Sequence, residues 1–413
     1  QGVSSAASDV YKRQVFVMNG ASLTVTGAST FGGNTVVSGS GGVLPNVSGY
    51  GPFTAANGSA YGPDLFVGGN VVFSPAPGQS LTVGNLGGAG NLADPNVSAN
   101  ASAPNANGAF FVTGGGLVTL TGTSYLSGAM TVNSGTLLLS ATATEQGTSL
   151  VTVGQNPGDN ATLALGGSSF LALGGWNFNA PAASTDQPVM IAENAGSTGT
   201  VVIGAGPGSN GAFIAARTFT GGSGTASVVF TQQYAAEAGT NPLYPFYTSL
   251  TGSLGIAQVG IGTTRLQPLY GPNTFTGPVT VYSGTLATTG TAAALAGTSL
   301  LTVMPGAVLS LGQTEGVNNA ALVTLSGGVL RTGTSLIETL GVLALTGTNT
   351  SAIDFLGNAA TLNFTLLVLE ASSPLSIWNY SGGNDFLNVA TGAAIGDLAN
   401  VRFYSCLLYT SPS

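Results

Sequence analysis

Histidine is absent from the sequence, and cysteine and lysine each occur only once. Without histidine, general base catalysis at neutral pH would depend on carboxylates, and zinc sites that combine cysteine with histidine are excluded. A single cysteine cannot form an internal disulfide framework. We therefore expect no metal site, no cofactor site and no thiol redox chemistry in this chain.

Charged residues are also scarce, at 5% of the chain, and the net charge is −8. This acidic balance argues against binding to nucleic acid or to an anionic membrane surface. No run of 18 or more apolar residues occurs, so no transmembrane helix is predicted. In contrast, 43% of the residues are hydrophobic and 65 are glycine. The chain is too apolar to be disordered, and its outer faces must be built from small polar residues and glycine.

The fourteen acidic residues are scattered, and none forms a close carboxylate pair of the kind that acid–base catalysis uses. A repetitive fold could still bring together Asp354, Asp385 and Asp397, which lie near the C-terminal end. We expect these three to be solvated residues of turns, because catalytic carboxylates need close neighbours that perturb them. Serine and threonine nucleophiles have no histidine or basic partner. We therefore assign no catalytic residue.

What the chain does contain is a repeated phrase. Residues 276–286 (Thr-Gly-Pro-Val-Thr-Val-Tyr-Ser-Gly-Thr-Leu) restate residues 127–137 (Ser-Gly-Ala-Met-Thr-Val-Asn-Ser-Gly-Thr-Leu), which lie 149 positions earlier, and a looser copy occurs at 31–39. Around the two full copies, longer super-repeats span about 71–167 and 228–312. The return of turn glycines together with alternating apolar residues is typical of a repeat architecture.

Short segments of alternating residues fill these repeats. In Val118-Thr119-Leu120, for example, two aliphatic side chains point one way and a threonine points the other way. Such strands recur at alternating short and long steps that sum to roughly 22 residues, within the range of one solenoid repeat; in the second copy they start near Val279, Leu286, Leu301, Leu309, Leu322 and Leu330. We predict an all-β solenoid of parallel strands, a β-helix with one elongated core, with Val118 and Leu120 directed inward.

Two segments without apolar alternation, Ala93 to Gly108 and Tyr234 to Pro242, are predicted to be surface loops. The solenoid domain is predicted to span residues 15–404, and its final module begins at about 340.

The two chain ends do not follow the repeat pattern. Residues 1–14 contain the lysine and residues 405–413 contain the cysteine. Both segments resemble translated sequencing-adapter read-through, so we expect them to be foreign to the fold. Because loose chain ends carry few contacts, we also expect them to contribute little to stability.

The stretch from Gly271 to Leu286 reads Gly-Pro-Asn-Thr-Phe-Thr-Gly and, after Pro278, Val-Thr-Val-Tyr-Ser-Gly-Thr-Leu. It resembles the autotransporter-associated β-strand repeat, and the stretch from Ile353 to Tyr404 resembles the last module of large exported proteins of that group. Pro278 departs from the usual pattern, in which a second glycine is common. The resemblance covers most of residues 15–404. It implies a right-handed parallel β-helix, exported by a bacterium to the cell surface or outer membrane, with membrane attachment only through flanking regions.

From these features we expect a non-enzymatic structural or adhesive rod that is secreted or displayed on the cell surface. Its partners would be surface glycans, other cells or neighbouring rods, which an adhesin of this kind could bind through many weak contacts.

Two alternatives stay open. A carbohydrate-active lyase or hydrolase would need cations, and the body of the chain offers only the four arginines Arg217, Arg265, Arg331 and Arg402. A solenoid that binds glycan or ordered water would use outward threonines, as at Thr24 and Thr26 or Thr119 and Thr121. Tryptophan can stack on sugars, but we expect both tryptophans, Trp176 and Trp378, to be buried in the fold.

Overall fold

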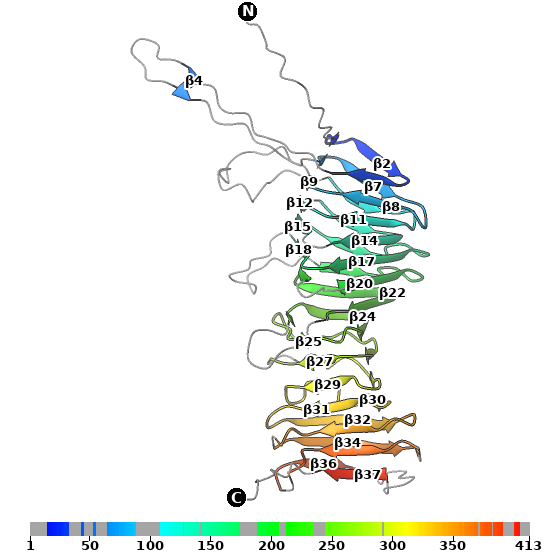
Figure 1. The fold of residues 1–413 in the computed structure, drawn as a ribbon, viewed down its shortest axis with the longest axis vertical. Coiled ribbons are helices and arrows are strands. Elements are labelled where there is room, and N and C mark those ends of the chain that lie inside the picture. Colours follow the sequence, from blue (N-terminus) through cyan, green and yellow to red (C-terminus); the bar gives the residue numbers. More distant parts are fainter. Residues whose placement is uncertain are drawn as a thin grey trace, which may run out of the picture.

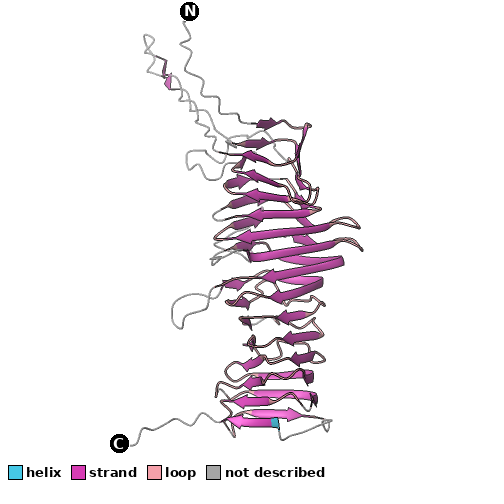
Figure 2. Cartoon of the chain, turned by 45° about the vertical axis from the view of Figure 1, so that its right-hand side comes forward, coloured by secondary structure: helices cyan, strands magenta, loops and turns pink. Residues whose placement is uncertain are grey.

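The computed structural model describes residues 15–32, 43–44, 53–54, 64–87, 108–126, 128–140, 143–173, 188–205, 212–233, 244–290, 293–357, 359–370, 372–381, 383–390 and 400–404. Within them the strands lie one above another along a rod, from β2 at one end to β37 at the other (Figure 1). Every element of these residues is a strand, apart from the single 3₁₀ residue Asn400 (Figure 2). The predicted all-β class is confirmed.

The strands are grouped into faces, because equivalent strands of successive rungs pair side by side. The first face consists of two sheets, of seven and eight strands. The seven-stranded sheet contains β1 (Val15–Val17), β6 (Leu65–Val67), β9 (Leu86–Gly87), β12 (Thr123–Tyr125), β15 (Thr144–Thr148), β18 (Phe170–Leu173) and β21 (Phe213–Ala215). The eight-stranded sheet contains β23 (Tyr244–Phe246), β25 (Thr263–Leu266), β27 (Thr285–Thr288), β29 (Val308–Leu311), β31 (Val329–Thr332), β33 (Ser351–Asp354), β35 (Leu375–Trp378) and β37 (Val401–Tyr404).

The second and third faces share one sheet of twenty strands. On the second face lie β2 (Ser22–Thr26), β7 (Asn70–Ser74), β10 (Phe110–Val112), β13 (Met130–Val132), β16 (Val151–Val153), β19 (Pro188–Ile191) and β36 (Phe386–Val389). On the third face lie β3 (Ser29–Phe31), β8 (Ser80–Val83), β11 (Leu117–Leu120), β14 (Gly135–Leu139), β17 (Asn160–Gly166), β20 (Thr198–Ala205), β26 (Val279–Val281), β28 (Leu300–Val303) and β30 (Leu322–Leu325). Four longer strands run across both faces: β22 (Thr218–Phe230), β24 (Ser249–Gln258), β32 (Ile337–Leu345) and β34 (Thr361–Leu369).

All pairings between the rungs described are parallel, and the single antiparallel pair joins β4 (Val43–Leu44) to β5 (Phe53–Thr54). The sequence prediction of stacked parallel strands is therefore confirmed, and the arrangement is solenoid-like. One interruption exists on the first face. β21 leads into β22 and β23 leads into β24, and β22 pairs with β24, yet β21 and β23 belong to different sheets.

One continuous apolar core fills the space between the faces. Val118 and Leu120 point inward and are fully buried, as the alternation predicts. Along the third face, paired inward residues form an unbroken aliphatic column through twelve rungs: Leu81, Val118, Leu137, Leu163, Val201, Val228, Ile256, Val279, Leu301, Val323, Leu343 and Leu367. Each Å² of apolar surface removed from water contributes about 25 cal/mol, so this column is a main source of stability.

The predicted rung length is also confirmed in the C-terminal half. On the third face Val279 pairs with Leu301 and Leu301 with Val323, which are steps of 22 residues. On the first face Leu286 pairs with Leu309 and Leu309 with Leu330, steps of 23 and 21 residues. Rungs closer to the N-terminus are often longer, because additional residues are inserted at their corners.

The two copies of the repeated phrase lie at different corners of the rod. In the first copy, the strand β13 on the second face turns at Gly135 into β14 on the third face. In the second copy, β26 on the third face turns at Gly284 into β27 on the first face. The phrase therefore encodes a strand, a tight corner and a second strand, and does not encode one fixed position in the rung.

Both corner glycines are required by the geometry of stacking. Gly135 and Gly284 have positive φ angles of 86° and 61°. A Cβ atom at Gly284 would lie 2.3 Å from the carbonyl oxygen of Gly260 in the preceding corner, and one at Gly135 would lie 2.4 Å from that of Gly116. Any side chain would push successive corners apart, so glycine returns in each copy of the phrase.

This geometry predicts that Gly284→Ala destabilises the protein more than Gly306→Ala. Both glycines have positive φ, so both substitutions pay about 1 kcal/mol for the left-handed backbone. Only Gly284 adds a clash with backbone, because nothing lies within 4 Å of a Cβ at Gly306. Thermal melting of the two variants should show a clearly larger loss for Gly284→Ala. Equal losses would contradict the stacked-corner explanation.

Candidate functional site

The acidic residues of the described chain are mostly structural. Five of them are buried and accept hydrogen bonds from backbone amides of neighbouring segments: Asp64, Glu145, Glu338, Asp354 and Asp385. The expectation that Asp354 and Asp385 are solvated is therefore wrong, since they are only 3% and 0% exposed. Asp397, the third acid of that expected group, lies outside the described residues.

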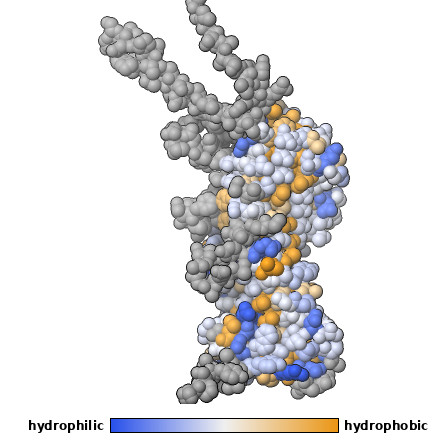
Figure 3. Space-filling view, viewed as in Figure 1, coloured by the Kyte–Doolittle hydropathy of each residue, from blue (hydrophilic) through white to orange (hydrophobic). Residues whose placement is uncertain are grey.

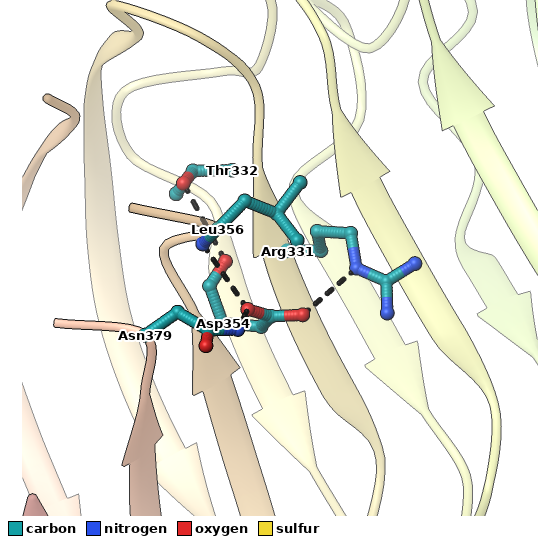
Figure 4. A network of polar contacts seen from close by, with 5 residues as sticks. All are labelled: Arg331, Thr332, Asp354, Leu356 and Asn379. Carbon is teal, nitrogen blue, oxygen red and sulfur yellow. Dashed lines mark hydrogen bonds and ion pairs between the residues drawn. The ribbon is translucent and has the colours of Figure 1, made fainter. Parts of the chain in front are cut away.

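Asp354 is the centre of a polar network on the first face (Figure 4). It ends β33, and its Oδ1 accepts hydrogen bonds from the backbone amide of Leu356 at 3.1 Å and from Nδ2 of Asn379 at 2.8 Å. Its Oδ2 accepts one from Nε of Arg331 at 3.0 Å. The backbone carbonyl of Asp354 accepts a long contact from the Thr332 hydroxyl at 3.5 Å. Three successive rungs are thus joined through one carboxylate.

Asp385 performs a separate task. Its Oδ1 accepts the amide of Ala360 at 2.9 Å, and its Oδ2 accepts the amide of Ser381 at 2.7 Å. No hydrogen bond or ion pair links it to Asp354 in the part of the chain that the structure describes. The two carboxylates therefore do not form the paired acid and base that a glycoside hydrolase would use.

Two buried glutamates replace missing strand contacts. Oε1 of Glu145 accepts from the Leu126 amide at 3.2 Å and from the Thr148 hydroxyl at 2.9 Å, and burial raises its pKa to about 8. Glu338 accepts the amides of Gly316 and Val317 at 2.9 and 3.0 Å. Burial raises its pKa to about 7, although the two amide hydrogen bonds lower it.

Asn273 makes the same kind of replacement at the other end of a stretch of the second face that carries no strand, between β24 and β32. Its Oδ1 accepts the Leu250 amide at 2.8 Å, and its Nδ2 donates to the carbonyl of Ala294 at 2.9 Å. The residue is 1% exposed. It is the asparagine of the Asn-Thr-Phe-Thr-Gly turn, so the motif was visible in the sequence although its bridging role was not.

The predicted outward threonine faces exist only in short ladders. Thr119 continues a ladder of Thr30 and Thr82, but the next rung places Leu138 there. Thr24 pairs with Val72, which ends that row at once. Thr26 pairs with Ser74, and Thr121 lies at a corner, where its hydroxyl donates to the Val83 carbonyl.

Longer hydroxyl ladders occur elsewhere on the third face: Thr136, Thr162, Thr200 and Ser227 in one row, and Thr280, Thr302 and Thr324 in another. Figure 3 shows the resulting surface, mostly pale with separate hydrophobic and hydrophilic patches. Flat polar rows thus alternate with apolar rungs and do not run the length of the rod.

Trp378 contradicts the sequence expectation of a buried tryptophan. It ends β35 on the outer side of the first face and is 39% exposed. Its neighbour in the next rung, Tyr404, is 48% exposed. Trp176 lies outside the described residues, as do the predicted loop Tyr234–Pro242 and Ala93–Gly108 up to its last residue.

The residues of 1–14 and 405–413, which the sequence sets apart, are likewise outside the described part. Within the described residues no group of three or more potential metal-ligating side chains is found. None of the described elements is a helix long and apolar enough to cross a bilayer. No protein-family model, no curated protein and no solved structure matches this chain.

The raised pKa values of Glu145 and Glu338 predict stability that decreases with rising pH. Between about pH 4.5 and 8 the folded chain keeps protons that the unfolded chain has released, so the free energy of unfolding falls across this window. Thermal melting from pH 5 to pH 8 should show a decreasing melting temperature.

Glu145→Gln should flatten that decrease, because the amide oxygen can still accept both hydrogen bonds and carries no titrating proton. Its melting temperature should match the unmodified protein near pH 5 and exceed it near pH 8. Glu370→Gln, at an exposed acid, is the matched control and should leave the profile unchanged. A profile that stays steep in Glu145→Gln would show that other groups cause it.

Proposed function

We propose that this protein is a non-enzymatic structural or adhesive rod, exported by a bacterium or displayed at its surface. The observation that carries this proposal is the single core cluster that extends without interruption from Val17 in the first rung described to Ile377 near the last. A stack of this kind keeps its two ends far apart and presents successive, nearly equivalent outer surfaces. Such a body suits the presentation of weak contacts in series.

The finer architecture that we propose is a right-handed parallel β-helix. A crossover between parallel strands of one sheet is right-handed in about 98% of cases, because twisted strands pack back onto the sheet most readily in that sense. The resemblance of Gly271 to Leu286 to the autotransporter-associated β-strand repeat supports the same hand. It also supports an extracellular or outer-membrane-associated location, with attachment supplied by flanking regions.

The state of the acids supports a rod over an enzyme. Hydrolysis or elimination on a polysaccharide needs a carboxylate or base free to exchange a proton with substrate. Asp354 and Asp385 instead use both carboxylate oxygens to hold backbone amides or side chains of adjacent rungs. Removing them would be expected to disturb folding before it disturbed any chemistry.

A second candidate function, a carbohydrate-binding solenoid, is favoured by one specific observation. Trp378 and Tyr404 are exposed on neighbouring strands of one face. Aromatic side chains with an apolar ring and a polar edge are suited to such contacts. This function is compatible with an adhesive rod, whereas a lyase or hydrolase is not.

We predict that the full chain releases no product from any member of a panel of soluble and insoluble polysaccharides. The assay would measure new reducing ends and unsaturated products over long incubation, together with retention of the protein on each polymer. Retention without product would support the proposal. Product release that Asp354→Asn or Asp385→Asn abolishes, with melting temperature preserved, would identify an enzyme and overturn it.

A further inference from the structure

The outer side of the first face carries an unusual column of residues at its C-terminal end. Register places Arg331 beside Asp354, Asp354 beside Trp378 and Trp378 beside Tyr404, each in the next rung. Arg402 lies two residues before Tyr404 on the same strand and is exposed. Because residues two apart on a strand share a face, its side chain lies on the same side of the sheet as Tyr404.

Arg331 is held in a defined orientation. Its Nε donates to Oδ2 of Asp354 at 3.0 Å, and that carboxylate is fixed in turn by Leu356 and Asn379. Figure 4 shows the two terminal nitrogens of the guanidinium directed away from Asp354. The Arg331 side chain is 35% exposed and that of Asp354 only 4%. The terminal nitrogens therefore present a planar pair of donors of the kind that binds a carboxylate in a bidentate manner.

The positive charges of the described chain are concentrated on this face. Of its four arginines, Arg265, Arg331 and Arg402 all lie on strands of the eight-stranded sheet, and Arg265 and Arg331 are in the same outward column, separated by two intervening rungs. The whole protein carries a net charge of −8. A local group of arginines in an acidic protein indicates an anionic group on the partner.

The exposed rings define the rest of that partner. Trp378 and Tyr404 are 39% and 48% exposed on adjacent strands, which are about 4.8 Å apart. From Arg331 to Tyr404 the column crosses three such spacings, roughly 14 Å, enough for a short oligosaccharide. The C–H face of a sugar ring can pack on an aromatic ring while its carboxylate is held by a guanidinium. A nucleic acid fits less well, because its many phosphates would be repelled by the acidic remainder of the molecule.

We propose that Arg331, Trp378, Arg402 and Tyr404 form a binding site for a segment of acidic polysaccharide whose sugar units carry carboxylates. Arg331 and Arg402 bind the carboxylates, and Trp378 and Tyr404 pack against the sugar rings along the rod. Asp354 is a positioning residue that orients Arg331. This inference rests on the proposed adhesive function and names the chemical class of its ligand.

The test uses the full chain and oligogalacturonate, a linear oligosaccharide with one carboxylate per sugar, in isothermal titration at low salt. Arg331→Gln and Trp378→Ala should each weaken binding by about tenfold, since each removes one charge-assisted or ring contact. Arg331→Lys should restore little of the loss, because lysine keeps the charge but lacks the planar pair of donors. Binding should also weaken as salt is added.

The matched control is Tyr282→Ala, which removes a ring that is 51% exposed on a different part of the rod and should leave the affinity unchanged. Melting temperatures of all variants establish that they fold. Asp354→Asn should weaken binding less than Arg331→Gln does. Once Asp354→Asn has released the guanidinium, adding Arg331→Lys should cost little further affinity, because the fixed orientation that distinguishes arginine from lysine is already lost.

Several outcomes would overturn the site. These are no binding of oligogalacturonate by the unmodified protein, equal binding of its fully methyl-esterified form, full restoration by Arg331→Lys, or tighter binding of a single-stranded oligonucleotide of equal charge. Failure of the site is distinguishable from failure of the proposed function. Absent binding with no product leaves the rod in place without this ligand, whereas unsaturated or shortened oligosaccharide in the titration cell would make the protein an enzyme.

Discussion

Main-chain hydrogen bonds between successive rungs are the interaction on which the rest of this structure depends. Each strand must satisfy its donors and acceptors through the rungs before and after it, because a buried amide without a partner is costly. Where a strand is lost, as on the second face between β24 and β32, a side chain takes over the missing partner. Asn273 does so at one end of that stretch and Glu338 at the other. The scarcity of acids and their burial thus have a common cause, which is repair of the ladder.

The same requirement explains the composition of the corners. Stacked turns bring backbone against backbone, so that Gly135 and Gly284 each face a carbonyl oxygen of the preceding corner. A phrase that provides one strand, such a corner and a second strand can serve at any corner of the rod. This is why two copies that match over eleven residues in the sequence occupy different faces in the structure.

Much of the fold could be predicted from the sequence, because alternation is a local property. Inward Val118 and Leu120, parallel stacking and a rung of about 22 residues follow from patterns within one or two rungs. The environment of an outward residue depends on which residue the next rung places beside it. Insertions of different length shift that register, so the sequence alone could not show that Trp378 is exposed beside Tyr404. The same limit applied to Asp354, whose partners come from rungs on both sides.

The interruption of the first face between β21 and β23 has a mechanical consequence. A cavity of about 10 Å³ lies beside it, lined by residues that include Phe230, Phe246 and Gln232, and the Gln232 side-chain oxygen has no hydrogen-bond partner among the described residues. The other two faces continue across this level through β22 and β24. A beam notched on one side is most compliant toward that side, so lateral load on the rod concentrates bending strain at this level. The molecule behaves as two stiff segments joined by an elastic hinge with a single preferred direction of flexure.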